Sequence, residues 1–312
     1  MPAPPAISVI LTTCNRRHLL PRAIASVLAQ DDAEFELIIV DDCSTDDSRS
    51  YLAGLRDPRI RVLATPRNSG VAAARNVGLD AARADVFALL DDDDVYLPNR
   101  LSAPLRIFSR HPDVVCTLSS AVKISPKKVQ TAVMPDLKLA SKALAWALLC
   151  DLIGVEGTSI TARRAAAASI GGFSTRMKTI EDREFLIRMA RLGGGYLIAE
   201  PLWQKYWSDS SLSAQRALAG AALVSYAAMQ PELAKRFRKL GCYLATKILV
   251  ADLRHGLFAA FLRDWSAFRA AGLIDGNVGS MWSDHREVAI YRRKMKSGDA
   301  LAALNGPPEQ WA

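Results

Sequence analysis

Strand and helix patterns alternate through the first hundred residues. Leu20, Ile24, Val27 and Leu28 recur at helical spacing, and 72–82 is an alanine-rich helical segment. Short, mostly apolar runs of the kind that form buried parallel strands occur at 7–11, 35–40, 60–63 and 86–90. This β-α-β order predicts an α/β fold with a mostly parallel sheet, flanked by helices and joined by right-handed crossovers.

The pattern is less regular in the middle of the chain. The polar segment 123–138, with two prolines, predicts a loop or hairpin, and Gly193, Gly194 and Gly195 are expected to end a helix. Three helices are expected at 141–149, 163–168 and 182–191, and the pattern from about 214 onward is helical. We therefore expect a domain over 1–213, with halves 1–115 and 116–213, and a helical C-terminal extension over 214–312.

Composition narrows the class of protein. The chain has 312 residues, of which 50% are hydrophobic and 23% charged, so a wholly disordered chain is excluded. No uninterrupted apolar run is long enough to predict a transmembrane helix, and the N-terminus lacks the basic region of a signal peptide. The five cysteines are widely spread without a CxxC motif, which favours a reducing cytoplasm over a disulfide framework or zinc site.

The net charge of +8 is unevenly distributed. Residues 1–210 carry 26 Lys and Arg against 24 Asp and Glu, whereas 211–312 carry 14 against 8. The basic excess in the last third is either an ordinary solvated face or a surface for an anionic membrane or acidic partner.

Acidic clusters follow two of the predicted strands. Asp41 and Asp42 follow the second strand, and Asp91 to Asp94 follow the fourth. Ligands gather at the carboxyl ends of strands in an open parallel sheet, and oxygen-only donors favour Mg²⁺ or Mn²⁺. Solvated acidic turns are the alternative for either cluster alone.

Several short motifs follow one another in order along the chain. They are SVILTTCNR (8–16), SVLAQ (26–30), VDDCSTD (40–46), ARNVGL (74–79), LLDDDD (89–94), GGF (171–173) and ED (181–182). This ordered set resembles the family 2 glycosyltransferases, which have the GT-A fold. The similarity covers about residues 6–210, and the last hundred residues match no family pattern.

The resemblance implies roles for particular residues. Asp93 would bind the metal directly, and Asp91 would face the ribose or a metal-bound water, with Asp92-x-Asp94 as a shifted register. Asp182, in the pair with Glu181, would be the general base, and a helix-terminal acidic pair is the alternative. The nucleotide sugar would be bound by Thr12, Thr13, Asn15, Asp41, Asp42, Arg75, Asp91 and Asp92.

The function implied by this resemblance is sugar transfer. We expect a cytoplasmic, inverting, metal-dependent hexosyltransferase that uses Mn²⁺ or Mg²⁺. It would move a sugar from a nucleotide-diphosphate sugar, a UDP-sugar above others, to a saccharide or lipid-linked acceptor during surface polysaccharide synthesis. A nucleotidyltransferase or a non-catalytic scaffold derived from the fold are the alternatives. No nucleic-acid partner is expected.

The chain also departs from the family pattern. Cys14 replaces an aromatic residue, and Cys43 replaces a glycine, so a left-handed backbone at Cys43 would be strained. The loop at 205–211 lacks a histidine, for which Trp207 or Asp209 could substitute. The apolar and basic segment 244–263 fits a peripheral membrane helix, packing on the catalytic domain, or a homodimer contact.

Overall fold

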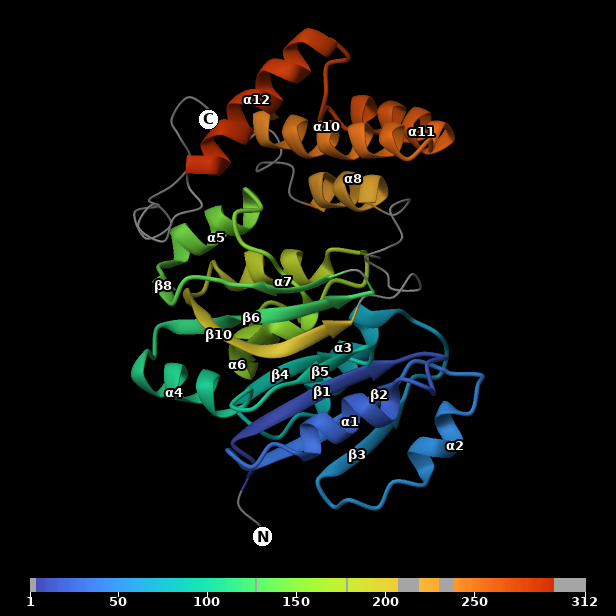
Figure 1. The fold of residues 1–312 in the computed structure, drawn as a ribbon, viewed down its shortest axis with the longest axis vertical. Coiled ribbons are helices and arrows are strands. Elements are labelled where there is room, and N and C mark those ends of the chain that lie inside the picture. Colours follow the sequence, from blue (N-terminus) through green and yellow to red (C-terminus); the bar gives the residue numbers. More distant parts are fainter. Residues whose placement is uncertain (1–3, 127, 178, 207–218, 230–237, 295–312) are drawn as a thin grey trace.

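The four strands predicted in the first hundred residues are confirmed in the computed structural model. The structure describes residues 4–126, 128–177, 179–206, 219–229 and 238–294. Neighbouring strands in the order β3-β2-β1-β4 pair in parallel, as the sequence predicts (Figure 1). Their bounds are β1 (Ile7–Thr13), β2 (Phe35–Asp41), β3 (Ile60–Ala64) and β4 (Val86–Asp91).

The sheet continues beyond β4 as a mixed sheet. Its order is β3-β2-β1-β4-β9-β6-β10-β5, with β7 paired to β6 and β8 to β10. Because β9 runs antiparallel to both β4 and β6, the parallel arrangement is interrupted before the parallel pair β6 and β10. The remaining strands are β5 (Asp94–Tyr96), β6 (Val114–Ser125), β7 (Lys128–Ala132), β8 (Leu137–Leu139), β9 (Ile160–Arg163) and β10 (Gly194–Tyr206).

The expectation for the three glycines was wrong for Gly194 and Gly195, which begin strand β10. A Cβ atom on Gly194 would lie 2.5 Å from the Leu139 carbonyl oxygen, and one on Gly195 would lie 2.8 Å from Leu144. These glycines are therefore required by close packing of β10 against β8 and the helix behind it. The hairpin alternative for 123–138 is confirmed by the antiparallel pair β6 and β7.

Helices cover both faces of the sheet, because alternate residues of each strand point to opposite sides. In β1, Val9 and Leu11 enter one hydrophobic core, and Ile10 enters the other. The helices around the sheet are α1 (Leu20–Leu28), α2 (Ser48–Ala53), α3 (Val71–Ala81), α4 (Ser102–Arg110), α5 (Ser141–Leu149), α6 (Arg164–Ser169) and α7 (Glu181–Met189), with a short 3₁₀ helix, η1 (Gly157–Ser159).

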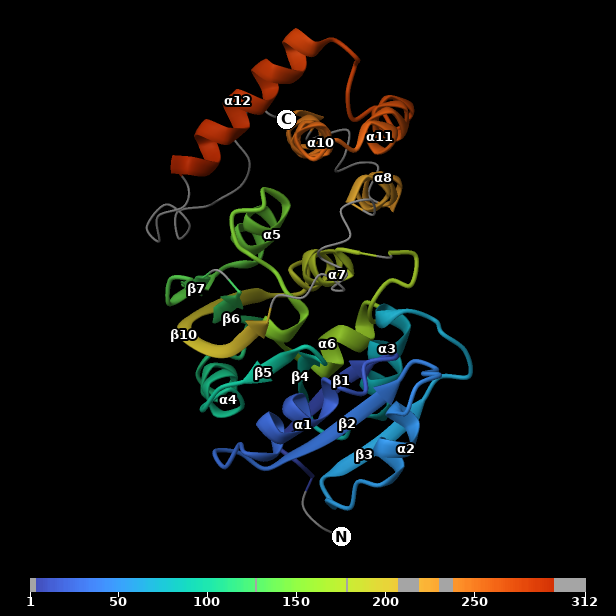
Figure 2. The ribbon, with the colours of Figure 1, turned by 45° about the vertical axis from the view of Figure 1, so that its right-hand side comes forward.

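Helices also form the described part of the chain after residue 214, as expected. They share a hydrophobic core that includes Leu249 and Phe268. Figure 2 shows α8, α10 and α11 stacked beyond α7, at the end of the molecule opposite β3. No helix in the described ranges is both long and apolar enough to span a bilayer. Their bounds are α8 (Ala219–Met229), α10 (Arg238–Arg254), α11 (Phe258–Ala270) and α12 (Val278–Lys294).

Candidate active site

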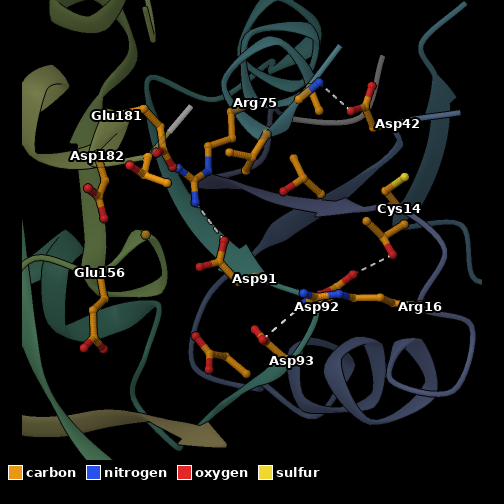
Figure 3. Close-up of a pocket in the computed structure, with 18 of the residues that line it drawn as sticks. Cys14, Arg16, Asp42, Arg75, Asp91, Asp92, Asp93, Glu156, Glu181 and Asp182 are labelled. Carbon is orange, nitrogen blue, oxygen red and sulfur yellow. Dashed lines mark hydrogen bonds and ion pairs between the residues drawn. The ribbon is translucent and has the colours of Figure 1, made fainter. Parts of the chain in front are cut away.

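A pocket of about 480 Å³ opens at the carboxyl ends of β1 and β4. In Figure 3, Asp91, Asp92 and Asp93 lie between a side with Cys14 and Asp42 and a side with Glu156 and Asp182. The pocket therefore joins the parallel half of the sheet to helix α7. Nine of the predicted site residues line it: Thr12, Thr13, Asp42, Arg75, Asp91, Asp92, Asp93, Glu181 and Asp182.

Asp42 orders the loop that leads into α3. Its carboxylate accepts hydrogen bonds from the backbone N–H of Ser69 at 2.9 Å and of Gly70 at 2.7 Å, and from the Thr65 hydroxyl at 2.6 Å. Gly70 has φ of 87°, a conformation that glycine adopts without strain. Asp42 thus fixes the approach to the N-terminus of α3 at the edge of the pocket.

Asp41 and Asn15 are not among the residues that line the pocket. Asp41 pairs with Arg49 at 3.0 Å and accepts the Ser44 backbone N–H. The Asn15 amide oxygen accepts the backbone N–H of Thr45 at 2.6 Å. Both side chains therefore hold the loop after β2 in place, beside the pocket.

Arg16, which the sequence reasoning missed, neutralises two carboxylates of the acidic cluster. Its Nη1 lies 2.9 Å from Asp92 and 3.1 Å from Asp93, and the Thr13 hydroxyl donates to Asp92 at 2.7 Å. Burial raises the pKa of Asp92 to about 6, although Arg16 and Thr13 favour its charged form. The signal available in the sequence was a basic pair, Arg16 and Arg17, directly after the first strand.

Arg75 joins the two sides of the pocket. Its guanidinium lies 2.8 Å from Asp91 at the end of β4 and 2.8 Å from Glu181 at the start of α7 (Figure 3). Although burial disfavours the cation, these carboxylates raise the pKa of Arg75. A Cβ atom on Gly157 would lie 2.2 Å from Nη2 of Arg75, so this position leaves no room for a larger residue.

Asp182 has the properties of a group that exchanges protons near neutral pH. Within the described structure its carboxylate accepts the Arg183 backbone N–H at 2.7 Å and has no ion-pair partner. Burial and the negative charge of Glu181 raise the pKa of Asp182 to about 7, against the opposing charges of Arg75 and Arg183. Ile180, two residues before Asp182, has φ of 58°, which is unusual for a β-branched side chain.

The acidic cluster contains donors suited to a divalent cation. Ion pairs occupy Oδ1 of Asp91 and Oδ2 of Asp93, and burial raises the pKa of Asp93. Asp94 accepts the Thr158 hydroxyl at 2.5 Å through Oδ2, whereas its buried Oδ1 has no partner among the described residues. The described ranges contain no group of three or more metal-binding side chains. Two carboxylates completed by phosphate oxygens are a common arrangement for Mg²⁺.

Two further lining residues, Glu156 and Lys205, were not among the predicted site residues. Glu156 lies 2.6 Å from Lys123 and 3.7 Å from Lys205. Burial lowers the pKa of Lys205, but Glu156 and the acidic cluster more than offset this effect. These side chains add a charged wall on the Asp182 side of the pocket.

Both unusual cysteines lie near this pocket. Burial raises the pKa of Cys14, which lines the pocket and accepts a hydrogen bond from Asn68 at 3.2 Å, so its thiol stays protonated at neutral pH. Cys43 has φ of 60°, which confirms the left-handed backbone expected there. Trp207 and Asp209 lie outside the described residues.

Comparisons with known proteins give a family match for the first part of the chain. Residues 8–152 match the family described as "Glycosyl transferase family 2". This part of the chain, a little under half of it, is similar to that family. A stretch of 115 residues is 43% identical to the putative colanic acid biosynthesis glycosyl transferase WcaA of Escherichia coli, covering 36% of this chain and 40% of WcaA.

A second relative is the UDP-Glc:alpha-D-GlcNAc-diphosphoundecaprenol beta-1,3-glucosyltransferase WfgD of Escherichia coli. It is 33% identical over 105 residues, which are 34% of this chain and 42% of WfgD. The chain thus spans about two fifths of the length of these curated relatives.

The fold extends further than the sequence match. The mannosyltransferase PcManGT from Pyrobaculum calidifontis, solved with GDP-Man and Mn²⁺, superimposes with a TM-score of 0.59 at 19% identity. The match covers 96% of this chain and 86% of PcManGT. The GT-A fold class expected from the sequence is therefore confirmed.

Proposed function

We propose that this chain is an inverting, metal-dependent glycosyltransferase that uses a UDP-sugar. The observation that carries the proposal is the convergence of Asp91, Asp93 and Asp182 on one pocket, bridged by Arg75. The match of residues 8–152 to family 2 supports this function over a nucleotidyltransferase or a non-catalytic scaffold, the two alternatives that the sequence leaves open.

The nucleotide would bind on the side of the pocket formed by β1 and β2. Thr12 and Asp42 present polar groups there, and the ordered loop before α3 closes this side. Asp92, held by Arg16 and Thr13, would fix the backbone of the acidic cluster under the diphosphate. Asn15 and Asp41 would contribute indirectly, by holding the loop after β2.

Asp91 and Asp93 would hold a Mn²⁺ or Mg²⁺ ion, which supplies Lewis-acid stabilisation of negative charge on the departing diphosphate. Arg75 lies 2.8 Å from Asp91 and holds its carboxylate at the edge of the pocket. Lys205, which lies 3.7 Å from Glu156, adds positive charge near the same cluster. The chain's own residues therefore place compensating charge around the leaving group.

Asp182 would accept the proton of the attacking hydroxyl. A pKa near 7 gives it both an accessible ionised form and enough basicity for this role. Glu181 is held by Arg75, which fixes the first turn of α7 and the position of Asp182. A base and a leaving group on opposite sides of the sugar would produce inversion in a single displacement.

The acceptor would be a saccharide or a lipid-linked saccharide in polysaccharide biosynthesis, at the cytoplasmic side of a membrane. The names of WcaA and WfgD support this class of acceptor. The open pocket wall at Glu156 provides room for it beside Asp182.

Nucleotide selectivity tests the donor assignment. Melting temperature would be measured with UDP, GDP, dTDP or CMP, each with and without Mn²⁺, because a ligand bound only by the folded state stabilises it. We expect the largest increase with UDP and Mn²⁺, and its loss in Asp93→Asn. An equal response to all four nucleotides, or none to any, would contradict the donor assignment.

A further inference from the structure

Four large apolar side chains are exposed where α10 ends and α11 begins. Leu253 and Leu257 are 45% and 38% exposed, and Phe258 and Leu262 are 65% and 66% exposed. They occur within ten consecutive residues. Such a concentration of exposed apolar side chains is typical of a binding surface.

The structure divides the apolar residues of this segment into two sets. Leu244, Ile248, Leu249 and Phe261 belong to or pack against the core of the C-terminal helices. The exposed set is therefore not required for packing within the chain. Packing within the chain thus accounts for one set of side chains in 244–263, and the exposed set is available for a membrane or a second copy of the chain.

The basic and acidic residues of this corner also differ in their exposure to solvent. Arg254, Arg263 and Arg269 are exposed, whereas Asp252 and Asp264 are each only 2% exposed. Arg263 pairs with Asp264 at 2.7 Å, so Arg254 and Arg269 carry most of the positive charge of this corner. No acidic side chain is exposed between residues 253 and 271, all of which the structure describes. The surface seen by a partner is consequently apolar and basic, although the sequence of this segment contains acids.

We propose that this corner, residues 253–269, binds the surface of an anionic phospholipid bilayer. Leu253, Leu257, Phe258 and Leu262 would enter the boundary between headgroups and acyl chains, and the arginines would contact anionic headgroups. The same patch facing itself across a two-fold axis would place arginines against arginines, which disfavours a second copy as the occupant.

This inference rests on the proposed function only in the biological role that it gives to membrane binding. Membrane binding would bring the pocket to a lipid-linked acceptor, but the binding itself requires neither donor nor acceptor. A binding assay can therefore fail or succeed independently of sugar transfer.

Flotation with vesicles tests the proposal on the full chain. Phosphatidylcholine vesicles would be compared with vesicles in which about a third of the lipid is phosphatidylglycerol. We expect binding to the anionic vesicles that weakens with added salt, and little binding to neutral ones. Phe258→Ser with Leu262→Ser should weaken binding at least about tenfold, and Arg254→Gln with Arg269→Gln by about fivefold per arginine.

The matched control is Val129→Ser with Val133→Ser, which removes apolar side chains that are 66% and 68% exposed elsewhere. It should float like the wild type, and all variants should keep the wild-type melting temperature. Equal binding by the Phe258 and Leu262 variant, or no binding by the wild type at low salt, would overturn the proposal. So would a wild-type dimer in light scattering that this variant converts to a monomer, because the occupant would then be a second copy.

Discussion

At the residue scale, the proposed sugar transfer depends on the protonation state of Asp182. Its carboxylate lies beside Glu181, which is committed to Arg75, so one carboxylate is structural and the other is left for chemistry. The raised pKa of Asp182 follows from this separation of roles.

This separation predicts the pH dependence of turnover. The active base is the ionised form, so kcat should rise with pH through about 7 and fall as Asp182 becomes protonated below it. Asp182→Asn should lower kcat by about 10²-fold to 10⁴-fold with a small change in the affinity for nucleotide. A pH–rate profile of both proteins checks this, and a wild-type rate independent of pH between 5 and 8 would contradict the assignment.

Gly157 provides a test of the Arg75 bridge. In Gly157→Ala the new methyl group would displace the guanidinium from Asp91 and Glu181, because it would lie 2.2 Å from Nη2. We expect kcat to fall at least about tenfold as the catalytic groups lose their positions.

Gly154→Ala is the matched control, since no atom lies within 4 Å of the added methyl group. Steady-state kinetics on both variants, with melting temperatures to confirm folding, would decide the role of the bridge. Equal losses in both variants would show that the bridge is not the cause.

At the element scale, the turn after β2 carries a residue that suits its geometry poorly. Cys43 has φ of 60°, where a side chain costs about 1–2 kcal/mol and glycine costs less. Asp41, the last residue of β2, and Asp42, which follows it, both accept hydrogen bonds from backbone N–H groups. The turn therefore cannot relax without losing these hydrogen bonds.

Replacing this residue should therefore change stability in a defined direction. Cys43→Gly should raise the free energy of unfolding by about 0.5–1 kcal/mol, after the entropy cost of glycine is subtracted. Cys43→Val should lower it, because a β-branched side chain is still less compatible with this backbone. Urea unfolding monitored by circular dichroism measures both changes, and a less stable glycine variant would refute the argument.

The elements that the sequence predicted well are those with local signals. The strands β1, β2, β3 and β4 are continuous apolar runs, and the acidic clusters follow two of them directly. Strand β10 was missed because its glycines, usual helix terminators, are required by close contacts with Leu139 and Leu144, which are distant in sequence.

The same reliance on local signals explains which site residues were found. Asp42, Arg75 and Asp182 lie in motifs. Lys205 reaches the pocket through the pairing of β10 with β5 and β6, and Glu156 reaches it from the residue before η1. No local pattern distinguishes such residues from other surface charges.

At the scale of the whole molecule, Asp151 joins the C-terminal helices to the catalytic region. Its carboxylate lies 2.8 Å from Arg183 of α7, 3.3 Å from Lys247 of α10 and 2.8 Å from Arg292 of α12. Despite burial, these three cations hold the pKa of Asp151 below its usual value. Arg183 follows Asp182 directly, so this cluster links the helical extension to the first turn of α7.

Asp151→Asn should destabilise the protein, because three cations would lose their shared anion. Since the side chain is 27% exposed, we expect a loss of about 1–3 kcal/mol, below the cost at a fully buried site. Asp113→Asn removes a more exposed carboxylate, 60% accessible and paired with Lys138, and should destabilise the protein less than Asp151→Asn does.

The contribution of Asp151 to the free energy of unfolding should change with pH in a defined direction. Because the folded-state pKa of Asp151 is lowered, its contribution is complete above the unfolded value, near 4, and is lost as pH falls through the folded value. Urea unfolding at pH 7 and at pH 3 should therefore give a smaller difference between wild type and Asp151→Asn at the lower pH. An equal difference at both values would count against the ion cluster.

The most direct test of the central claim is the anomeric form of the sugar released from a UDP-α-sugar when water replaces the acceptor. Proton NMR would follow the purified chain with Mn²⁺ and a panel of UDP-sugars. We expect slow formation of UDP with the β-anomer released first, and loss of this reaction in Asp182→Asn. Release of the α-anomer first, or an unchanged rate in Asp182→Asn, would contradict an inverting transferase with Asp182 as its base.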